Sequence, residues 1–292
     1  MVPDVMINVD IIGGSGFIGT RLTARLKNEQ NISLKIIDKA PSYTFSELVT
    51  ECDVRRPEQL RKSLSDCSVI VNLAAEHRDD VYPPSKYEEV NVDGARNICA
   101  IANEKGSRTI IFTSTVAVYG FAPINTDEFG AITPFNEYGR TKFQAEQVFK
   151  AWQEESPNER TLVIIRPTVV FGEKNRGNVY NLLRQIASGK FIMVGSGENR
   201  KSMAYVENVA AFIEHAMNFK PGVHIYNFTD KPDFTMNALV DRVGAGAVEA
   251  LACGVALAQR HARHAKARVI SNARALDAPG STKAPDGLTV SA

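Results

Sequence analysis

Tyr138 and Lys142 lie four residues apart in the segment YGRTK, which has helical periodicity. On a helix this spacing places both side chains on one face, with their Cβ atoms about 6 Å apart. An isolated tyrosine titrates at about 10 and is a poor base at neutral pH. A neighbouring ammonium group favours the phenolate, so the pair can exchange a proton with a substrate hydroxyl. An ordinary amphipathic helix can carry the same two residues, and the spacing alone does not separate the two interpretations.

A glycine-rich turn follows the apolar stretch of residues 6–12, and from Phe17 to Leu26 apolar residues recur at helical spacing. In such a turn the first glycine permits the tight bend, the second lets a pyrophosphate approach, and the third lets helix and strand pack closely. The free N–H groups at the start of the helix also attract phosphate. The pattern predicts a dinucleotide-binding turn made of Gly13, Ser15, Gly16, Phe17, Ile18 and Gly19.

Asp38 ends the second predicted strand, which includes residues 34–37. A carboxylate at that position can accept hydrogen bonds from the adenosine ribose hydroxyls and repels a 2′-phosphate. The sequence therefore favours NAD over NADP. Lys39 stands beside it and keeps NADP open as the less favoured alternative, and a solvated aspartate at a strand end is the simpler interpretation.

Short apolar runs rich in β-branched residues alternate with helix-like segments along the chain. Strands are predicted within residues 6–12, 34–37, 69–75, 109–114, 162–166 and 224–228. Helices are predicted at 17–26, 87–104, 138–152, 178–188 and 206–218, and a surface loop at 121–134. The strands are apolar throughout, as expected when both faces of a sheet are covered. This order predicts an α/β fold: a Rossmann-type doubly wound parallel sheet with a smaller C-terminal substrate-binding lobe.

We expect three regions along the chain: an NAD-binding Rossmann domain at 1–172, a substrate-binding lobe at 173–243 interleaved with the end of the sheet, and an atypical tail at 244–292. Fourteen of the 49 tail residues are alanine and none is aromatic, so the tail lacks material for a packed core. A helix is possible at 245–267, and disorder is expected from Asn272 onward. We hypothesise that the tail carries no function and results from a reading-frame shift.

Charge and cysteine content limit the possible functions. The chain has 34 Lys and Arg against 33 Asp and Glu, so no basic excess indicates a nucleic-acid partner. The four cysteines have neither disulfide-framework nor zinc-site spacing, which favours a reducing, cytoplasmic location without a metal site. No signal peptide or run of 18 apolar residues is present in the sequence, so we expect an unprocessed protein without a membrane partner.

Taken together, the motifs resemble those of the extended short-chain dehydrogenase/reductases, in the NAD-dependent epimerase/dehydratase family that acts on nucleotide sugars. The resemblance covers about residues 7–234 and follows the family's order. Its segments are GGSGFIG at 13–19, an acidic residue at 38, CDV at 52–54, NLAA at 72–75, NVDG at 91–94, TST at 113–115 with YG at 119–120, Tyr138 with Lys142, and RP at 166–167 with FG at 171–172.

The resemblance implies a catalytic set of Thr115, Tyr138 and Lys142. Thr115 would hydrogen-bond the substrate oxygen, Tyr138 would be the acid and base, and Lys142 would bind the nicotinamide ribose and lower the tyrosine pKa. Besides the turn and the Tyr–Lys pair, the implied cofactor contacts are Asp38, Lys39, Asp53, Val54, Leu73, Ala74, Ala75, Asn91, Thr113 and Pro167. The candidate substrate contacts are His77, Thr115, Asn178, Arg200 and Lys201. A solvated loop is an equally good interpretation of His77, and each of the last three fits a solvated surface residue as well.

The residues after Thr115 narrow the reaction. Related 4,6-dehydratases carry Asp-Glu there, whereas this chain has Val116 and Ala117, which cannot transfer protons. Epimerisation at C4 through a 4-keto intermediate is therefore favoured. The first alternative is NAD(P)H-dependent reduction of a 4-keto-6-deoxy nucleotide sugar in surface-polysaccharide synthesis, and the second is a non-catalytic NAD(P)-binding sensor. The resemblance also implies a homodimer, formed through the helices at 87–104 and 138–152.

Overall fold

The structure is a computed structural model, and it describes residues 6–78 and 80–244. The alanine-rich segment after Gly244 lies outside the described residues, together with the helix, the disorder and the reading-frame shift expected there.

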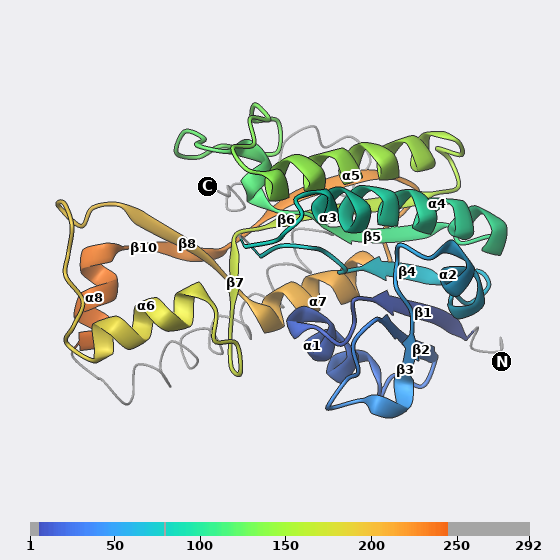
Figure 1. The fold of residues 1–292 in the computed structure, drawn as a ribbon, viewed down its shortest axis with the longest axis horizontal. Helices are drawn as coiled ribbons and strands as arrows, with labels where there is room; N and C mark the ends of the chain where they lie inside the picture. Colours follow the sequence, from blue (N-terminus) through green and yellow to red (C-terminus); the bar gives the residue numbers. More distant parts are fainter. Residues whose placement is uncertain (1–5, 79, 245–292) are drawn as a thin grey trace.

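Seven parallel strands form the central sheet, in the order β3-β2-β1-β4-β5-β6-β9 (Figure 1). The strands are β1 (Ile7–Ile12), β2 (Ile32–Asp38), β3 (Val49–Glu51), β4 (Val69–Asn72), β5 (Thr109–Thr113), β6 (Thr161–Pro167) and β9 (Gly222–Phe228). The predicted α/β fold with a Rossmann-type parallel sheet is confirmed. Only β3, which has three residues, was not predicted from the sequence.

Helices cover both faces of this sheet (Figure 1). Helices α1 (Phe17–Leu26) and α7 (Val206–Ala216) bury their apolar sides in one core, while α2 (Pro57–Ser63), α4 (Gly94–Lys105) and α5 (Glu137–Glu154) do so in the other. Because each strand faces a core on both sides, its apolar residues run continuously rather than alternating.

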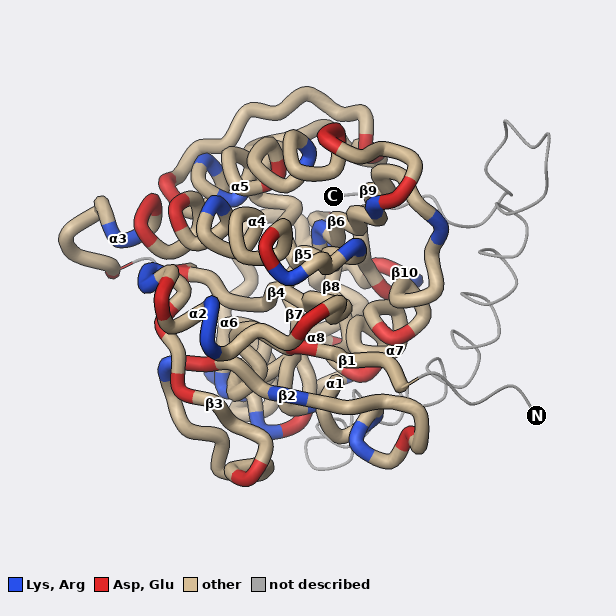
Figure 2. Tube along the Cα trace, turned by 90° about the vertical axis from the view of Figure 1, so that its right-hand side faces the viewer, with Lys and Arg blue, Asp and Glu red and all other residues tan. Residues whose placement is uncertain are grey.

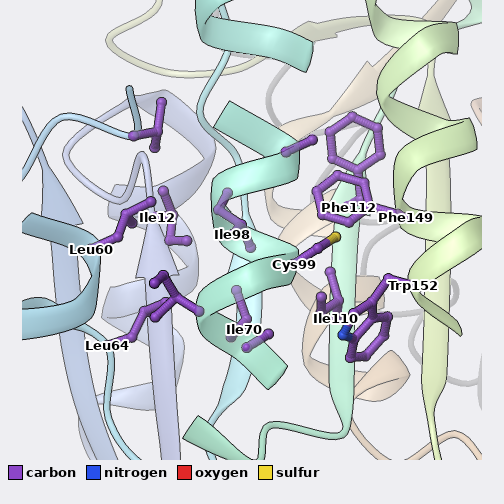
Figure 3. Packing of buried hydrophobic residues seen from close by; sticks show 14 of the residues in the cluster. Ile12, Leu60, Leu64, Ile70, Ile98, Cys99, Ile110, Phe112, Phe149 and Trp152 are labelled. Atoms are coloured by element: carbon purple, nitrogen blue, oxygen red, sulfur yellow. The ribbon is translucent and has the colours of Figure 1, made fainter. Parts of the chain in front are cut away.

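The core under α4 and α5 fixes the helix that carries Tyr138 and Lys142. Figure 3 shows apolar side chains of α2, α4 and α5 packed on those of the strands. Phe149 of α5 lies against Phe112 of β5, with ring centroids 4.7 Å apart, and Trp152 is buried one turn further along. Burying a large apolar side chain stabilises a fold by about 1.5–3 kcal/mol. These contacts hold α5 firmly against the sheet.

A smaller unit stands at one end of the sheet, at the left of Figure 1. It contains a three-stranded sheet in the order β10-β8-β7, made of β10 (Asp230–Thr235), β8 (Arg200–Tyr205) and β7 (Val169–Phe171). Helices α6 (Asn178–Ala187) and α8 (Met236–Gly244) enclose its apolar core. Because α7 and β9 belong to the central layers, residues 173–243 contribute to both units.

The remaining elements are short connections. They are α3 (Ser85–Tyr87), a π-helical segment η2 (Glu88–Asp93) that runs into α4, and two 3-10 turns, η1 (Ser46–Leu48) and η3 (Val116–Tyr119).

Among the described helices, none combines the length and the apolar character needed to cross a membrane. Figure 2 shows basic and acidic positions interspersed on the side of the molecule that faces the viewer.

Candidate active site

The glycine turn between β1 and α1 has no room for a side chain at its first and third glycines. Gly13 has a φ of +77°, and a Cβ atom there would lie 2.6 Å from the backbone nitrogen of Ala74. A Cβ on Gly19 would lie 2.4 Å from the Cα of Gly14. The tight bend and the close packing that were predicted for the first and third glycines are therefore both present.

The start of α1 is also suited to a phosphate. Its cap residue is Gly16, which supplies no capping side chain, and its first turn contains no acidic residue. The N–H groups of the first turn of a helix have no partner within the helix and favour an anion. The glycine turn and this helix end fit the diphosphate of a dinucleotide.

Asp38 lies beside the glycine turn at the end of β2. Its carboxylate accepts hydrogen bonds from the backbone nitrogens of Ser15 (3.0 Å) and Ala40 (2.9 Å). The hydroxyl of Ser15 donates to the carbonyl of Ala40 at 2.9 Å. Lys39 is exposed. The acidic residue predicted to select the ribose therefore stands next to the predicted phosphate site.

Asp53 and Val54, two of the predicted cofactor contacts, lie shortly after β3. The carboxylate of Asp53 is paired with the guanidinium of Arg55 at 2.7 Å, which lowers the pKa of Asp53. Val54 is buried against Gly94, where a Cβ would lie 3.0 Å from its side chain. The sequence analysis missed Arg55, whose guanidinium forms an ion pair with the carboxylate of Asp53.

The segment after β4 approaches the glycine turn. The backbone nitrogen of Leu73 donates to Ile12 at 2.8 Å, and that of Ala74 donates to the side chain of Asn72 at 3.1 Å. Leu73, Ala74 and Ala75 are half-buried there. Leu73 and Ala74 stand directly beside Gly13, and Ala75 follows them in the chain.

Asn91 and Thr113, two further predicted cofactor contacts, form side-chain hydrogen bonds within the protein. The side-chain amide of Asn91 bonds both backbone groups of Glu76, at 2.9 and 3.1 Å, and donates to Thr141 of α5 at 3.0 Å. The Thr113 hydroxyl donates to the carbonyl of Asn72 at 3.3 Å. Both residues are buried, so each connects the segment after β4 to its neighbours.

The carboxyl end of β5 and the first turn of α5 bring the catalytic candidates together. The hydroxyl of Thr115 caps η3 by accepting from the nitrogen of Ala117 at 3.1 Å. Thr115 also lies near enough to the Tyr138 hydroxyl to oppose the effect of burial on the pKa of Tyr138. Gly139 allows this approach, because a Cβ on it would lie 2.5 Å from the carbonyl oxygen of Ala117. Asn136 caps the helix by accepting from the nitrogen of Gly139 at 2.8 Å. Thr115 and Tyr138 therefore lie close together.

Lys142 lies one turn further along α5 and is 1% exposed. Its ammonium nitrogen stands 4.1 Å from the centroid of the Phe112 ring. Burial lowers the pKa of Lys142 to about 7, although the charge of Glu146 acts in the opposite direction. Burial raises the pKa of Tyr138 to about 12, opposed by its bond with Thr115. Tyr138 therefore holds its proton at neutral pH until further positive charge is brought near.

A buried ion pair lies behind Lys142, and the sequence analysis did not predict it. Glu146 of α5 binds Arg166 of β6 through two hydrogen bonds of 2.9 and 2.6 Å, and it accepts a third from the hydroxyl of Ser114 at 2.6 Å. The two charged side chains are at most 2% exposed. An arginine inside the apolar strand TLVIIRP was the available signal, since a buried charge requires a partner.

The remaining predicted residues are spread over several elements. Pro167 is buried at the end of β6, opposite Phe228 of β9. The predicted substrate contacts His77, after β4, and Asn178, the first residue of α6, are exposed. Arg200 and Lys201 are neighbours on β8, so their side chains point to opposite faces of the small sheet.

The candidate residues of the central sheet share one edge. Gly13, Leu73 and Thr115 follow the carboxyl ends of β1, β4 and β5 respectively, and Pro167 is the last residue of β6. In open parallel sheets this edge is where ligands bind. The fold and the Thr115–Tyr138–Lys142 set define an oxidoreductase of the short-chain dehydrogenase type.

The sequence profile of the "NAD dependent epimerase/dehydratase family" matches residues 9–228, and the chain therefore belongs to this family. The chain is 52% identical over 237 residues to an N-acetyl-alpha-D-glucosaminyl-diphospho-ditrans,octacis-undecaprenol 4-epimerase of Escherichia coli O157:H7. The match covers 81% of this chain and 71% of that protein.

Two solved structures share the fold. A UDP-glucose 4-epimerase from Thermotoga maritima, with UDP-glucose, has a TM-score of 0.71 at 21% identity, and the match covers 82% of each chain. The protein MoeE5, in complex with UDP-glucuronic acid and NAD, has a TM-score of 0.70 at 21% identity, with 82% of this chain and 81% of that one covered. At this identity the two structures establish the architecture.

Proposed function

We propose that this protein is an NAD-dependent epimerase that inverts C4 of a sugar carried on a diphosphate. The carrying observation is the close approach of the first turn of α5, which carries Tyr138, to η3 directly after Thr115, with Lys142 one helical turn further along. Val116 and Ala117, which begin η3 directly after Thr115, supply no acid or base for dehydration. The names of the 4-epimerase relatives support the same reaction.

The chain's own residues handle the proton of the reaction. NAD, when bound, supplies the reversible oxidant for C4. Tyr138 accepts the proton of the C4 hydroxyl as the ketone forms and returns it when the inverted alcohol forms. Thr115 donates a hydrogen bond to the C4 oxygen, where negative charge develops. The ammonium of Lys142 lowers the cost of the Tyr138 phenolate.

For the substrate we propose an N-acetylhexosamine linked to a polyprenyl diphosphate, with a nucleotide sugar as the alternative. The relative at 52% identity has a name that specifies such a lipid-linked substrate. The loop that leads into α5 also exposes four large apolar side chains: Phe121, Ile124, Phe129 and Phe135. Two of these side chains, Phe121 and Phe135, stack with centroids 4.8 Å apart. An exposed apolar set beside the active site favours a substrate with an apolar chain.

The test is to incubate the purified protein and NAD with undecaprenyl-diphospho-GlcNAc or with UDP-GlcNAc, to identify the released sugars, and to follow absorbance at 340 nm. The proposal expects the C4 epimer of the lipid-linked sugar without net formation or loss of NADH. Turnover of UDP-GlcNAc alone would assign the nucleotide substrate. A parallel incubation contains NADH and a 4-keto-6-deoxy nucleotide sugar. Consumption of NADH there would indicate the reductase, whereas binding of NADH without turnover of any of these sugars would indicate the sensor.

Tyr138→Phe provides the residue-level control for the same assay. We expect kcat to fall by about 10²–10⁴-fold while NADH binding persists, because only the proton acceptor is removed. Tyr43→Phe, which changes a fully exposed tyrosine, serves as the matched variant and should keep wild-type turnover. Equal kcat in the Tyr138→Phe protein would overturn the role of Tyr138.

Three further proposals concern the cofactor, the assembly and the compartment. We favour NAD over NADP because the carboxylate of Asp38 stands at the glycine turn. We propose a homodimer formed through α4 and α5, two helices that pack side by side on one face of the sheet. We place the protein in the cytoplasm because of the cysteine spacing. The expected lobes and the individual cofactor and substrate contacts belong to this proposal as well.

A further inference from the structure

Glu146 occupies a distinctive place on the catalytic helix. It follows Lys142 by four residues, so the two side chains share one face of α5, between the helix and the sheet. Its side chain is fully buried, and its carboxylate receives two hydrogen bonds from Arg166 and one from Ser114. Ser114 directly precedes Thr115. The carboxylate therefore connects α5, β5 and β6 immediately behind the reacting groups.

The pair continues into a larger buried network. Arg166 donates to the hydroxyl of Tyr119 at 2.5 Å, and that hydroxyl donates to the side chain of Asn227 on β9 at 2.7 Å. The backbone nitrogen of Asn227 in turn donates at 2.7 Å to the carboxylate of Glu128, in the loop that leads into α5. The network therefore joins η3, the strands β6 and β9, α5, Ser114 directly after β5, and the loop that precedes α5.

Several described elements bring charged or titratable groups to α5. Glu88 of η2 pairs with Arg140 of α5 at 3.4 Å, and Cys99 of α4 lies in the core beneath the helix. Helix α5 contributes Tyr138 and Glu146, β6 contributes Arg166, η3 contributes Tyr119, and Glu128 reaches the same network from the loop. Phe112 of β5 and Ser114, directly after that strand, carry no charge. At a fully buried site the negative charge of Glu146 acts on the Lys142 ammonium, and Arg166 is linked to it through its ion pair with Glu146.

We propose that Glu146 and Arg166 are positioning residues that set the charge and the place of Lys142, with the negative charge of Glu146 retaining the lysine proton and Arg166 limiting that effect. The inference rests on the proposed function for its catalytic meaning, but the charge coupling exists in the protein without substrate. A buried ion pair contributes little net stability compared with apolar residues of equal size, so its presence here calls for a role of this kind.

The two charges predict shifts of opposite sign. Glu146→Gln removes a negative charge and leaves Arg166 unopposed, so Lys142 should lose its proton at a pH about one unit lower than in the wild type. Arg166→Gln removes a positive charge, so the Lys142–Glu146 pair should lose its proton about one unit higher. A purely structural role would weaken both variants without moving this transition in opposite directions.

The measurement is the free energy of unfolding against pH, taken for each protein with and without the additional change Lys142→Met. The difference between the two curves reports the lysine alone, and it needs neither substrate nor cofactor. The alkaline limb of kcat against pH is the second readout and should move in the same directions. Failure of the proposed reaction would remove only the second readout, so the two hypotheses can fail separately.

Matched variants complete the test. Glu154→Gln removes an exposed carboxylate from the same helix and should leave the transition in place. Arg166→Lys keeps the charge and should restore most of the wild-type behaviour. If Glu146→Gln does not fold, the comparison of Arg166→Gln with Arg166→Lys decides alone, since only the first should shift. Shifts in the same direction for both Gln variants, or none in a folded Arg166→Gln protein, would overturn the proposal.

Discussion

At the scale of single residues, Lys142 is placed where its charge is costly. The side chain is almost completely buried, and burial lowers the pKa of Lys142 to about 7. In the unfolded chain a lysine titrates at about 10.4. Between these two values the unfolded state binds the proton more strongly, so the free energy of unfolding rises with pH. Below about pH 7 both states hold the proton, and the penalty is fully present.

Lys142→Met should remove this dependence. We expect the variant to be more stable than the wild type at pH 7, with the difference shrinking as the pH approaches about 10. Denaturant unfolding at a series of pH values measures it, and Lys150→Met, at a less buried position of the same helix, is the comparison. A wild type whose stability does not rise relative to the Met variant over this range would contradict the placement of the ammonium.

The residues behind the site show the limit of prediction from sequence. The spacing of Tyr138 and Lys142 placed both on one helical face, and the order of motifs added Thr115. The pairing of Glu146 with Arg166 joins positions on a helix and a strand, and no local pattern states which strand lies under a helix. Two signals were nevertheless available, namely the four-residue spacing from Lys142 and an arginine within an apolar strand.

At the scale of elements, the contact between η3 and the first turn of α5 decides whether Thr115 and Tyr138 meet. Gly139→Ala would bring a methyl group to 2.5 Å from the carbonyl oxygen of Ala117, a distance that real Cβ atoms essentially never show. The helix must then move away from η3. We expect kcat to fall by at least tenfold, since small displacements of reacting groups are costly.

The stability of the Gly139→Ala protein should change less than its activity. Alanine has a better helix propensity than glycine, by about 1 kcal/mol, and this offsets part of the strain. Gln147→Ala, at an exposed position of α5, is the matched variant and should leave both quantities near the wild type. Wild-type kcat in the Gly139→Ala protein would show that the two elements have room to spare.

Long apolar runs and long helices were predictable because their periodicity extends over many residues. Helix α1 was predicted with the bounds that it has, and the strands β5 and β6 to within one residue at each end. The small sheet was harder to predict. Strand β7 has three residues, and β10 contains a proline, so neither presents the pattern of a strand. Helix α2, with seven residues, was missed as well.

At the scale of the whole molecule, ion pairs and a hydrogen bond link α1, the helix that follows the glycine turn, to the smaller unit. Arg21 of α1 forms ion pairs with Glu207 of α7 at 3.2 Å and with Glu173, beyond β7, at 3.6 Å. The hydroxyl of Tyr205, at the end of β8, donates to the same Glu173 at 2.9 Å. Helix α1 is thus connected both to α7, on the same face of the central sheet, and to Glu173, which follows β7 of the smaller unit.

Because the turn belongs to this connected framework, binding of a dinucleotide should stabilise the entire described fold. A ligand at 100 times its Kd adds about 2.7 kcal/mol to the free energy of unfolding. We expect NADH to reach this value at lower concentration than NADPH, since the carboxylate of Asp38 repels a 2′-phosphate. Thermal unfolding at a series of cofactor concentrations measures both affinities.

Asp38→Asn removes the charge that should separate the two cofactors. Ser15 and Ala40 donate to different oxygens of the carboxylate, so the single amide oxygen can accept from only one of these two backbone nitrogens. The stabilisation by NADH and by NADPH should then become more alike, mainly through a gain for NADPH. Asp241→Asn, which changes an exposed aspartate of α8, should leave the difference as it is in the wild type. If the wild type is stabilised equally by both cofactors, Asp38 does not select between them, and the preference for NAD loses its physical basis.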